Sequence, residues 1–279
     1  MKHRVFGYIL SLSAACGLLV GGCQDKRGEA NGVEIAVTNS YLASVVGDLW
    51  GNDTDVLCLA PPGMCPGHFD ISPLQVKQLS GCRLLLLFDF QKQVEQKLSR
   101  LQKKGLKTVL VRKPGGLCVP ETYFEVCREV SNVLSSEYPE MSGLCRQRLS
   151  VIEKGLESLS EELLGKVRRA DVSSAKVIVS NHQADFARRL GLETIATFVG
   201  SDIETVAGID HCIKKAEGQD VRFVIANKQE GAAIAKALAQ RLGAGAVVFS
   251  NFPELGGGVN PFGELLRANV AALLEVAGQ

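Results

Sequence analysis

The chain has 279 residues, a formal net charge of +1 at pH 7 and 46% hydrophobic residues. The balanced charge, with no basic stripe, argues against a nucleic-acid-binding protein. The sequence also has no long block of like charges, the pattern that would indicate a disordered tail. The hydrophobic share is sufficient for a sizeable buried core. Beyond an N-terminal leader, about 250 residues remain, which predicts one large domain or two of medium size.

Residues 1–22 have the pattern of an export signal peptide. Lys2 and Arg4 give a positive start, and the apolar run that follows is too short to cross a membrane comfortably. The run ends in Leu19-Val20-Gly21-Gly22-Cys23, which resembles a bacterial lipobox and predicts lipidation of the Cys23 thiol. An uncleaved anchor, or a secretory signal with a chance cysteine, is the alternative. Residues 23–32 then form a flexible polar tether, so we expect an exported protein held by lipid on the periplasmic or extracellular face of the cell membrane.

The cysteine content is high, with nine in the chain. An exported protein meets oxidising conditions, in which disulfides form. Once the leader cysteine and Cys23 are set aside, an odd number remains, so at least one thiol is free or bound to metal. The seven that remain are Cys58, Cys65, Cys82, Cys118, Cys127, Cys145 and Cys212.

Short β-like runs alternate with helix-like runs in residues 33–139. The leucine-rich run Arg83–Phe88 is typical of a parallel strand buried on both faces. We predict a first α/β lobe with strands at Val33–Thr38, Asp55–Ala60, Arg83–Phe88 and Thr108–Arg112. Its predicted helices are Tyr41–Trp50, Pro73–Leu79, Gln91–Lys104 and Glu121–Glu137.

Residues 140–171 contain a long amphipathic segment. Apolar residues recur at steps of three and four from Glu140 to Arg169, which predicts one linking helix of about 45 Å. The alternation then resumes in a second lobe, 172–279. Its predicted strands are Ala175–Ser180, Leu192–Ile195, Val221–Ala226 and Ala246–Phe249, and its helices Gln183–Leu190, Asp210–Glu217, Glu230–Leu242 and Asn260–Val276. The predicted fold is therefore two α/β lobes, parallel sheets flanked by helices, bridged by one long helix.

A short loop carries the clearest chemical signal. It reads Pro61-Pro62-Gly63-Met64-Cys65-Pro66-Gly67-His68-Phe69-Asp70-Ile71-Ser72-Pro73. Imidazole is a common metal ligand, and a Cys-x-x-His spacing lets both side chains reach one ion, as in many zinc sites. Alternatives are a histidine that caps a turn and a redox-active Cys65, although the second cysteine of a redox pair is missing.

The order of these motifs resembles the zinc and manganese receptors of bacterial ABC transporters. The strand followed by Thr-Asn-Ser-Tyr-Leu, and the loop Pro-Pro-Gly-x-x-Pro-x-His-Phe-Asp-x-x-Pro, are similar to that family, which carries Gly-x-Asp-Pro-His-x-Tyr/Phe-Glu-Pro-x-Pro here. Phe186-Ala187-Arg188-Arg189-Leu190-Gly191-Leu192 and the final helix are also similar to it. The resemblance covers nearly all of the chain beyond the leader and implies a metal-binding cleft between two lobes.

The resemblance implies a set of metal ligands. His68 matches the family's first ligand, and Cys65 stands where the family usually has an aspartate. His182 lies at the strand–helix junction that carries a histidine or glutamate in the family. It matches only with a two-residue deletion, whereas gapless counting places Ser180 there. A helix-cap role is the alternative for His182.

Other positions depart from the family's pattern. The family's second histidine has no counterpart, and Cys118 is the only soft ligand in the matching stretch, with a buried structural cysteine as the alternative. Asn251 stands at the position of the family's last aspartate. Glu230 and Asp202 are nearby acidic candidates. A set of histidine and cysteine ligands favours zinc, whereas oxygen ligands suit manganese.

The predicted function is capture of a transition-metal ion and its delivery to a membrane permease, as the substrate-binding protein of an ABC importer. We expect a monomer that is not an enzyme and has no nucleic-acid partner. The cargo is Zn²⁺, with Mn²⁺ or another transition metal as alternatives. Two further alternatives are the same scaffold binding a larger metal chelate or corrinoid, and a thiol-dependent extracytoplasmic enzyme that uses Cys65. The chain lacks a nucleotide loop, a Gly-x-Ser-x-Gly elbow and a His-Glu-x-x-His helix.

Overall fold

The computed structural model describes residues 34–51, 54–60, 62–63, 70–102, 105–200, 203–256 and 259–278. Residues 33–279 form one compact unit. The predicted signal peptide, Cys23 and its tether lie outside the described residues, as do Cys65, His68 and Asp202. Within the described ranges, no helix is both long and apolar enough to cross a membrane.

The first lobe contains a parallel four-stranded sheet with the strand order β2-β1-β3-β4. Every residue of β3 is buried, because alternate side chains enter two hydrophobic clusters on opposite faces of the sheet. Helices α1 and α4 cover one face, and α2 and α3 the other. The strands are β1 (Ile35–Val37), β2 (Val56–Cys58), β3 (Leu84–Phe88) and β4 (Lys107–Val111), and the helices α1 (Ser40–Trp50), α2 (Pro73–Leu79), α3 (Lys92–Gln102) and α4 (Pro120–Glu137).

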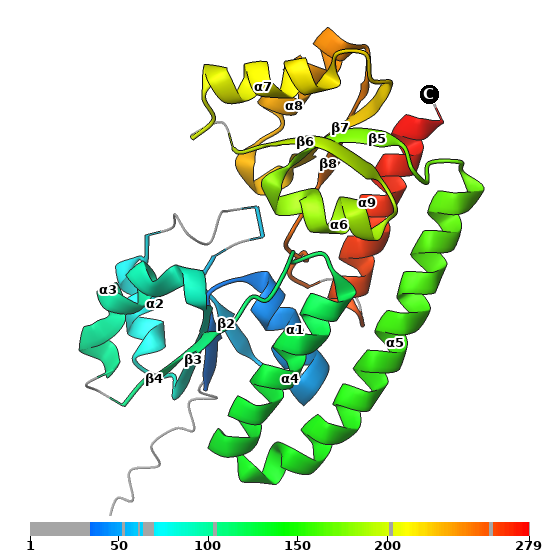
Figure 1. The fold of residues 1–279 in the computed structure, drawn as a ribbon. Helices are drawn as coiled ribbons and strands as arrows, with labels where there is room; N and C mark the ends of the chain where they lie inside the picture. Colours follow the sequence, from blue (N-terminus) through cyan, green and yellow to red (C-terminus); the bar gives the residue numbers. More distant parts are fainter. Residues whose placement is uncertain are drawn as a thin grey trace, which may run out of the picture. The chain divides into compact units, whose positions relative to one another are not determined.

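A single long helix, α5 (Ser142–Arg169), links the two lobes (Figure 1). It packs along α4, and on the second lobe's side it contacts the last helix of the chain. Residues Pro139–Met141 form a 3₁₀ turn, and the α-helix begins at Ser142, two residues later than the predicted start at Glu140. The predicted linking helix is otherwise confirmed.

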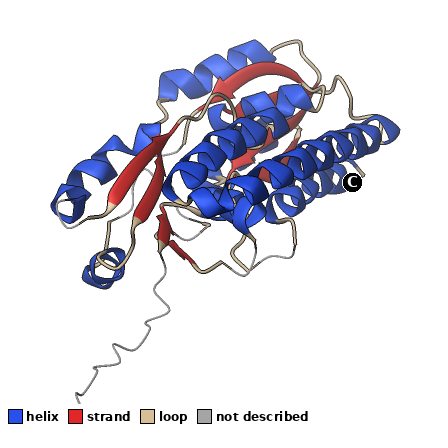
Figure 2. Cartoon of the chain, turned by 90° about the horizontal axis from the view of Figure 1, so that it is seen from below, coloured by secondary structure: helices blue, strands red, loops and turns tan. Residues whose placement is uncertain are grey.

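The second lobe repeats the architecture of strands flanked by helices (Figures 1 and 2). Its strands are parallel and have the order β6-β5-β7-β8. Helices α7 and α8 cover one face of this sheet, and α6, α9 and α5 contribute to the cluster on the other. The strands are β5 (Lys176–Ser180), β6 (Glu193–Phe198), β7 (Val221–Asn227) and β8 (Gly245–Phe249), and the helices α6 (Ala184–Arg189), α7 (Val206–Ala216), α8 (Ala233–Leu242) and α9 (Pro261–Ala277). The predicted fold class is confirmed.

Two helix starts in the second lobe differ from the predicted ones by three or four residues, and the other two by one. Helix α7 begins at Val206, four residues earlier than expected, because the Thr205 side chain accepts a hydrogen bond from the Gly208 amide and caps it. Helix α8 begins at Ala233, three residues later than expected. Residues 228–230 instead form a 3₁₀ turn that ends at Gly231, whose φ of 82° favours glycine.

Aromatic packing joins the last helix to the first lobe. Phe262, at the start of α9, stacks on Tyr123 of α4 with ring centroids 3.8 Å apart, and its ring meets that of Tyr41 of α1 edge-on at 5.7 Å. All three side chains are at most 1% exposed. The hydrophobic core is therefore continuous from the first sheet, through these rings, to the helices under the second sheet.

The carboxyl group of Asp48 gives the core a pH dependence. Burial raises its pKa from 3.8 to about 6, although the hydrogen bond from Tyr123 Oη at 2.7 Å and the charge of Arg148 act in the opposite direction. The folded state therefore holds this proton more tightly than the unfolded chain does, and stability falls as the pH rises from about 4 to about 6.

Asp48→Asn is therefore expected to stabilise the protein at pH 8 and not at pH 4. A tenfold change in proton affinity is worth about 1.4 kcal/mol, so the gain at pH 8 is roughly 1 to 3 kcal/mol. Urea unfolding at both pH values measures it, with the exposed Asp55→Asn as the matched control. Equal effects of Asp48→Asn at pH 4 and pH 8 would show that ionisation of Asp48 is not the cause.

Candidate functional site

A cavity of about 310 Å³ lies where the carboxyl ends of strands from both sheets meet. In open parallel sheets this edge is the usual place of ligand binding. The first lobe contributes residues that follow β3 and β4, and the second lobe contributes residues that follow β5, β7 and β8. The lining residues are Phe90, Lys113, Gly116, Leu117, Asn181, His182, Asp185, Asn227, Gln229, Glu230, Asn251 and Phe252.

The second lobe brings together two side chains that bind metals in many proteins. His182 Nε2 lies 3.4 Å from Glu230 Oε1. The second carboxylate oxygen, Glu230 Oε2, accepts hydrogen bonds from Ser180 Oγ at 2.7 Å and from Asn227 Nδ2 at 3.2 Å. The Glu230 side chain is 14% exposed and that of His182 is 61% exposed. The carboxylate is thus held in place, and the imidazole reaches solvent.

At two glycines, Gly200 and Gly116, the backbone approaches a side chain of the cavity lining closely. A Cβ atom on Gly200 would lie 3.0 Å from Cβ of Glu230, so a larger residue there would press on the carboxylate side chain. Across the cavity, a Cβ on Gly116 would lie 2.7 Å from Cβ of Asp185. Glycine at 116 therefore lets the loop before α4 contact helix α6 of the other lobe.

A layer of buried polar side chains supports the cavity. Gln183 Nε2 donates to Asn227 Oδ1 at 3.3 Å and to Asn251 Oδ1 at 3.0 Å. The Cys118 thiol donates to the Ser250 carbonyl at 3.0 Å and lies 3.4 Å from Asn251 Oδ1. Burial raises the pKa of the Cys118 thiol well above its usual value, with the hydrogen bond from Asn269 opposing. In this arrangement Cys118 is a protonated thiol, 1% exposed, and it would have to lose its proton before it could bind a metal.

The structure brings some of the predicted site residues together, whereas others lie outside the described residues. His182, Glu230 and Asn251 line one cavity, and Cys118 contacts Asn251. Cys65, His68 and Asp202 lie outside the described residues. Ser180 and Gln183 support the site, and the sequence pattern did not single out Gln183. Among the residues that the structure describes, no group of three or more histidine, cysteine, aspartate or glutamate side chains is placed to hold a metal ion.

Pro62, the second residue of the predicted metal-binding loop, contacts a residue that lines this cavity. Gln229, one of the lining residues, donates from Nε2 to the Pro62 carbonyl at 3.0 Å, and the same amide group contacts Ser250 Oγ at 3.0 Å. Its Oε1 atom accepts from the Asn251 amide at 3.1 Å. Gln229 therefore connects Pro62 to the lining of the cavity.

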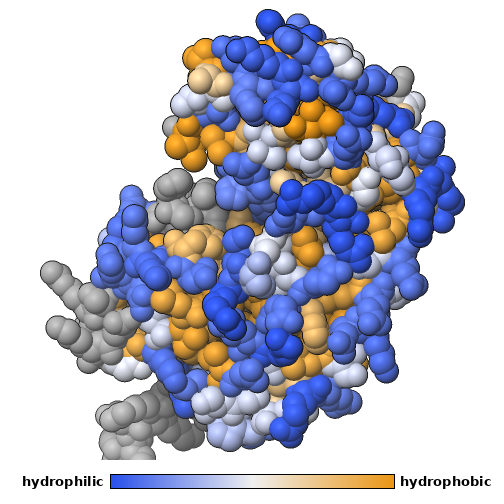
Figure 3. Space-filling model, in the orientation of Figure 1, coloured by the Kyte–Doolittle hydropathy of each residue, from blue (hydrophilic) through white to orange (hydrophobic). Residues whose placement is uncertain are grey.

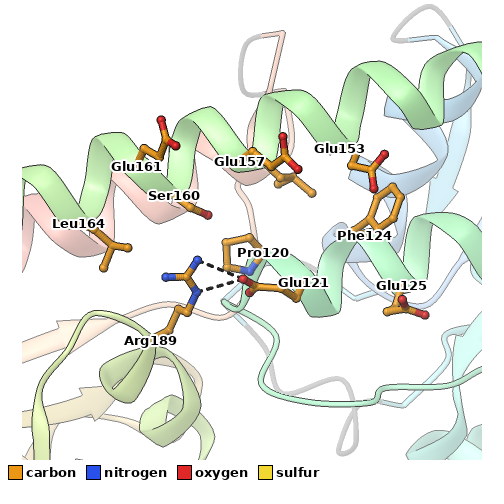
Figure 4. A pocket seen from close by; sticks show the side chains of 11 residues that line it. Pro120, Glu121, Phe124, Glu125, Glu153, Glu157, Ser160, Glu161, Leu164 and Arg189 are labelled. Atoms are coloured by element: carbon orange, nitrogen blue, oxygen red, sulfur yellow. Dashed lines mark hydrogen bonds and ion pairs between the residues drawn. The ribbon is translucent and has the colours of Figure 1, made fainter.

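A larger cavity, of about 470 Å³, runs between α4 and α5 (Figure 4). Its carboxylates follow four-residue steps on the two helices, at Glu121 and Glu125 and at Glu153, Glu157 and Glu161. Glu121 is paired with Arg189 of α6 at 3.0 Å. These groups are spread along the groove and do not converge on one point.

On the face of the molecule seen in Figure 3, hydrophobic residues form patches separated by hydrophilic ones.

Comparison with known proteins identifies the fold and the family. A family model described as "ZnuA: Zinc-uptake complex component A periplasmic" matches residues 118–276, more than half of the 279-residue chain. The match begins after the Pro61–Pro73 loop, so the predicted roles of Cys65 and His68 stay predictions. No curated protein sequence matches the chain.

Solved structures agree over most of the chain. A ZnuA crystal structure aligns with a TM-score of 0.71 at 18% identity, covering 87% of this chain and 98% of that chain. A zinc-bound ZnuA deletion mutant aligns with a TM-score of 0.69 at 17% identity, covering 87% and 97%. A manganese-bound periplasmic metal-binding protein from Candidatus Liberibacter asiaticus aligns with a TM-score of 0.73 at 12% identity, covering 87% and 98%.

These likenesses confirm the predicted two-lobed fold with its long connecting helix. The family match confirms the predicted class, a binding protein and not an enzyme. The resemblance read from the motifs is confirmed as well. The chain belongs to the ZnuA family, the periplasmic metal-binding component of zinc-uptake systems.

Proposed function

We propose that this protein captures a transition-metal ion in the cavity that His182 and Glu230 line, and passes it to the permease of an ABC importer. The observation that carries the proposal is the contact between His182 and Glu230. An imidazole and a held carboxylate lie 3.4 Å apart at the carboxyl ends of two strands, in a ZnuA-type fold. The proposed anchor is a lipid on Cys23, which would keep the receptor at the membrane beside its permease.

We propose His68 and Cys65, which follow Pro62 in the sequence, as the remaining ligands. The contact between Gln229 and the Pro62 carbonyl supports this proposal, because it holds Pro62 against the residue that precedes Glu230 in the chain. Cys118, Asn251 and Asp202 stay candidates. For Cys118, a ligand role requires its thiol to leave the Ser250 carbonyl and lose its proton.

Zinc is the cargo that this donor set favours. Imidazole and thiolate are the ligands that zinc prefers, and one carboxylate is compatible with it. Among the proteins of similar fold, one structure is described as zinc-bound and others as manganese- or cadmium-bound. Manganese would be favoured if Cys65 took no part, because the site would then lack the thiolate that selects zinc.

Metal analysis of the reduced protein, purified without oxygen, tests this function. We expect one zinc per chain, and loss of that zinc in His68→Ala. Cys65→Ser and Cys118→Ser show which thiol binds the metal. His211→Ala is the control, since His211 is exposed on α7 and should keep the full zinc content. A reduced protein that retains no metal would contradict the proposal.

A further inference from the structure

The cavity is larger than a bare metal ion requires. Its volume is about 310 Å³, whereas one water molecule occupies about 30 Å³ of the liquid. Pockets that hold small organic ligands begin at about 300 Å³. The space around the His182–Glu230 pair therefore suits an ion that carries further atoms with it.

Part of the lining is apolar and contributes no ligand to a metal. Phe90 is 47% exposed, and its ring stacks on that of Phe88 with centroids 5.4 Å apart. Leu117 and Phe252 are also in the lining and are largely buried. An exposed aromatic ring beside buried apolar side chains offers contact area to a carbon skeleton.

A positive charge also lines the cavity. The half-buried Lys113 donates from Nζ to the Gly115 carbonyl at 2.9 Å, and no carboxylate among the described residues forms an ion pair with it. The carboxylate of Asp185, which shares the lining, is paired with Arg188. A lysine here repels an incoming divalent cation and attracts an anion.

The proposed protein ligands leave coordination positions open on a six-coordinate ion. His182 and Glu230, together with the His68 and Cys65 of the proposed function, complete a four-coordinate site but leave two positions of a six-coordinate one. A carboxylate-bearing organic molecule that accompanies the ion would fill those two. Its other carboxylate oxygens would then be available to Lys113.

We propose that this cavity binds the metal ion together with a small carboxylate-bearing chelator. His182 and Glu230 bind the ion, Lys113 pairs with a carboxylate of the chelator, and Phe90 packs against its carbon skeleton. The inference rests on the proposed function, because it identifies the form in which the same cargo arrives. Lys113 and Phe90 both come from the first lobe, so the chelator bridges the two sides of the cavity.

Equilibrium dialysis with zinc chloride and radiolabelled citrate tests whether the cavity binds the metal ion together with a chelator. The full chain, reduced, is expected to retain zinc and citrate in equal amounts. Lys113→Met should weaken citrate retention about tenfold, because it removes one hydrogen bond between charged groups. Its affinity for zinc without citrate should be higher, because the charge that repels the cation is gone. Lys176→Met is the matched control, since Lys176 contacts Gln219 and does not line the cavity.

Each outcome separates this inference from the proposed function. Zinc retained while citrate stays in the dialysate overturns the chelator proposal and leaves the metal receptor intact. Citrate that only strips zinc from the protein overturns it in the same way, as does equal weakening by Lys113→Met and Lys176→Met. A chain that binds zinc neither with nor without citrate contradicts the proposed function itself.

Discussion

Replacing Glu230 with glutamine is expected to weaken zinc binding by about 100-fold or more. Removing groups that merely orient a metal ligand costs about 10- to 100-fold in affinity, and Glu230 is proposed to be a ligand itself. The glutamine side chain keeps nearly the same shape and can still accept the hydrogen bond from Ser180 Oγ. The loss would therefore come from the missing negative charge. Competition against a chromophoric zinc chelator at pH 7 measures the affinity.

The matched control is Glu254→Gln, which makes the same change in charge elsewhere on the second lobe. Glu254 is exposed and pairs with Lys228 at 3.0 Å, outside the lining of the cavity. This variant should bind zinc as the parent protein does. If Glu230→Gln also bound zinc with unchanged affinity, the ion would have to be held by other residues.

The fold could be predicted from the sequence because its signals are local. The leucine-rich run that became β3 lies entirely within the buried centre of its sheet. The three- and four-residue steps of α5 follow one face of a helix, and that face packs on α4. The predicted starts of α7 and α8 were wrong, because one capping side chain, Thr205, sets where α7 begins and one turn, ending at Gly231, delays the start of α8.

The site was only partly predictable because it depends on pairing between distant segments. His182 follows β5, and a strand–helix junction is visible in the sequence. Glu230 follows β7, and its position beside His182 requires β5 and β7 to be neighbours in the sheet. No local sequence pattern predicts that strand order, so the sequence analysis identified Glu230 only as a nearby acidic candidate. Lys113, from the other lobe, carried no signal for the same reason.

Phe262→Ala is expected to lower the free energy of unfolding by about 3 to 5 kcal/mol, the range for phenylalanine truncation in a core. The side chain is fully buried, with Tyr123 stacked on it at 3.8 Å and Tyr41 against its edge. The sequence could not reveal this contact, because it joins residues 139 positions apart, from 123 to 262. Urea unfolding at pH 7 measures the change. Leu255→Ala, at a position that is 50% exposed, should cost less than about 1 kcal/mol and serves as the control.

The same variant tests whether the aromatic packing makes the two lobes unfold together. Trp50 is the only tryptophan of the chain and lies in α1 of the first lobe, against Tyr138. Its fluorescence therefore reports on the first lobe, whereas far-ultraviolet circular dichroism reports on both. In the parent protein the two transitions should coincide. In Phe262→Ala we expect the fluorescence transition to separate from the circular dichroism transition, since α9 no longer anchors the second lobe to Tyr41 and Tyr123. Coincident transitions at an unchanged midpoint would mean that other contacts between the lobes, such as Cys118 with the Ser250 carbonyl and Glu121 with Arg189, keep them together without the Phe262 ring.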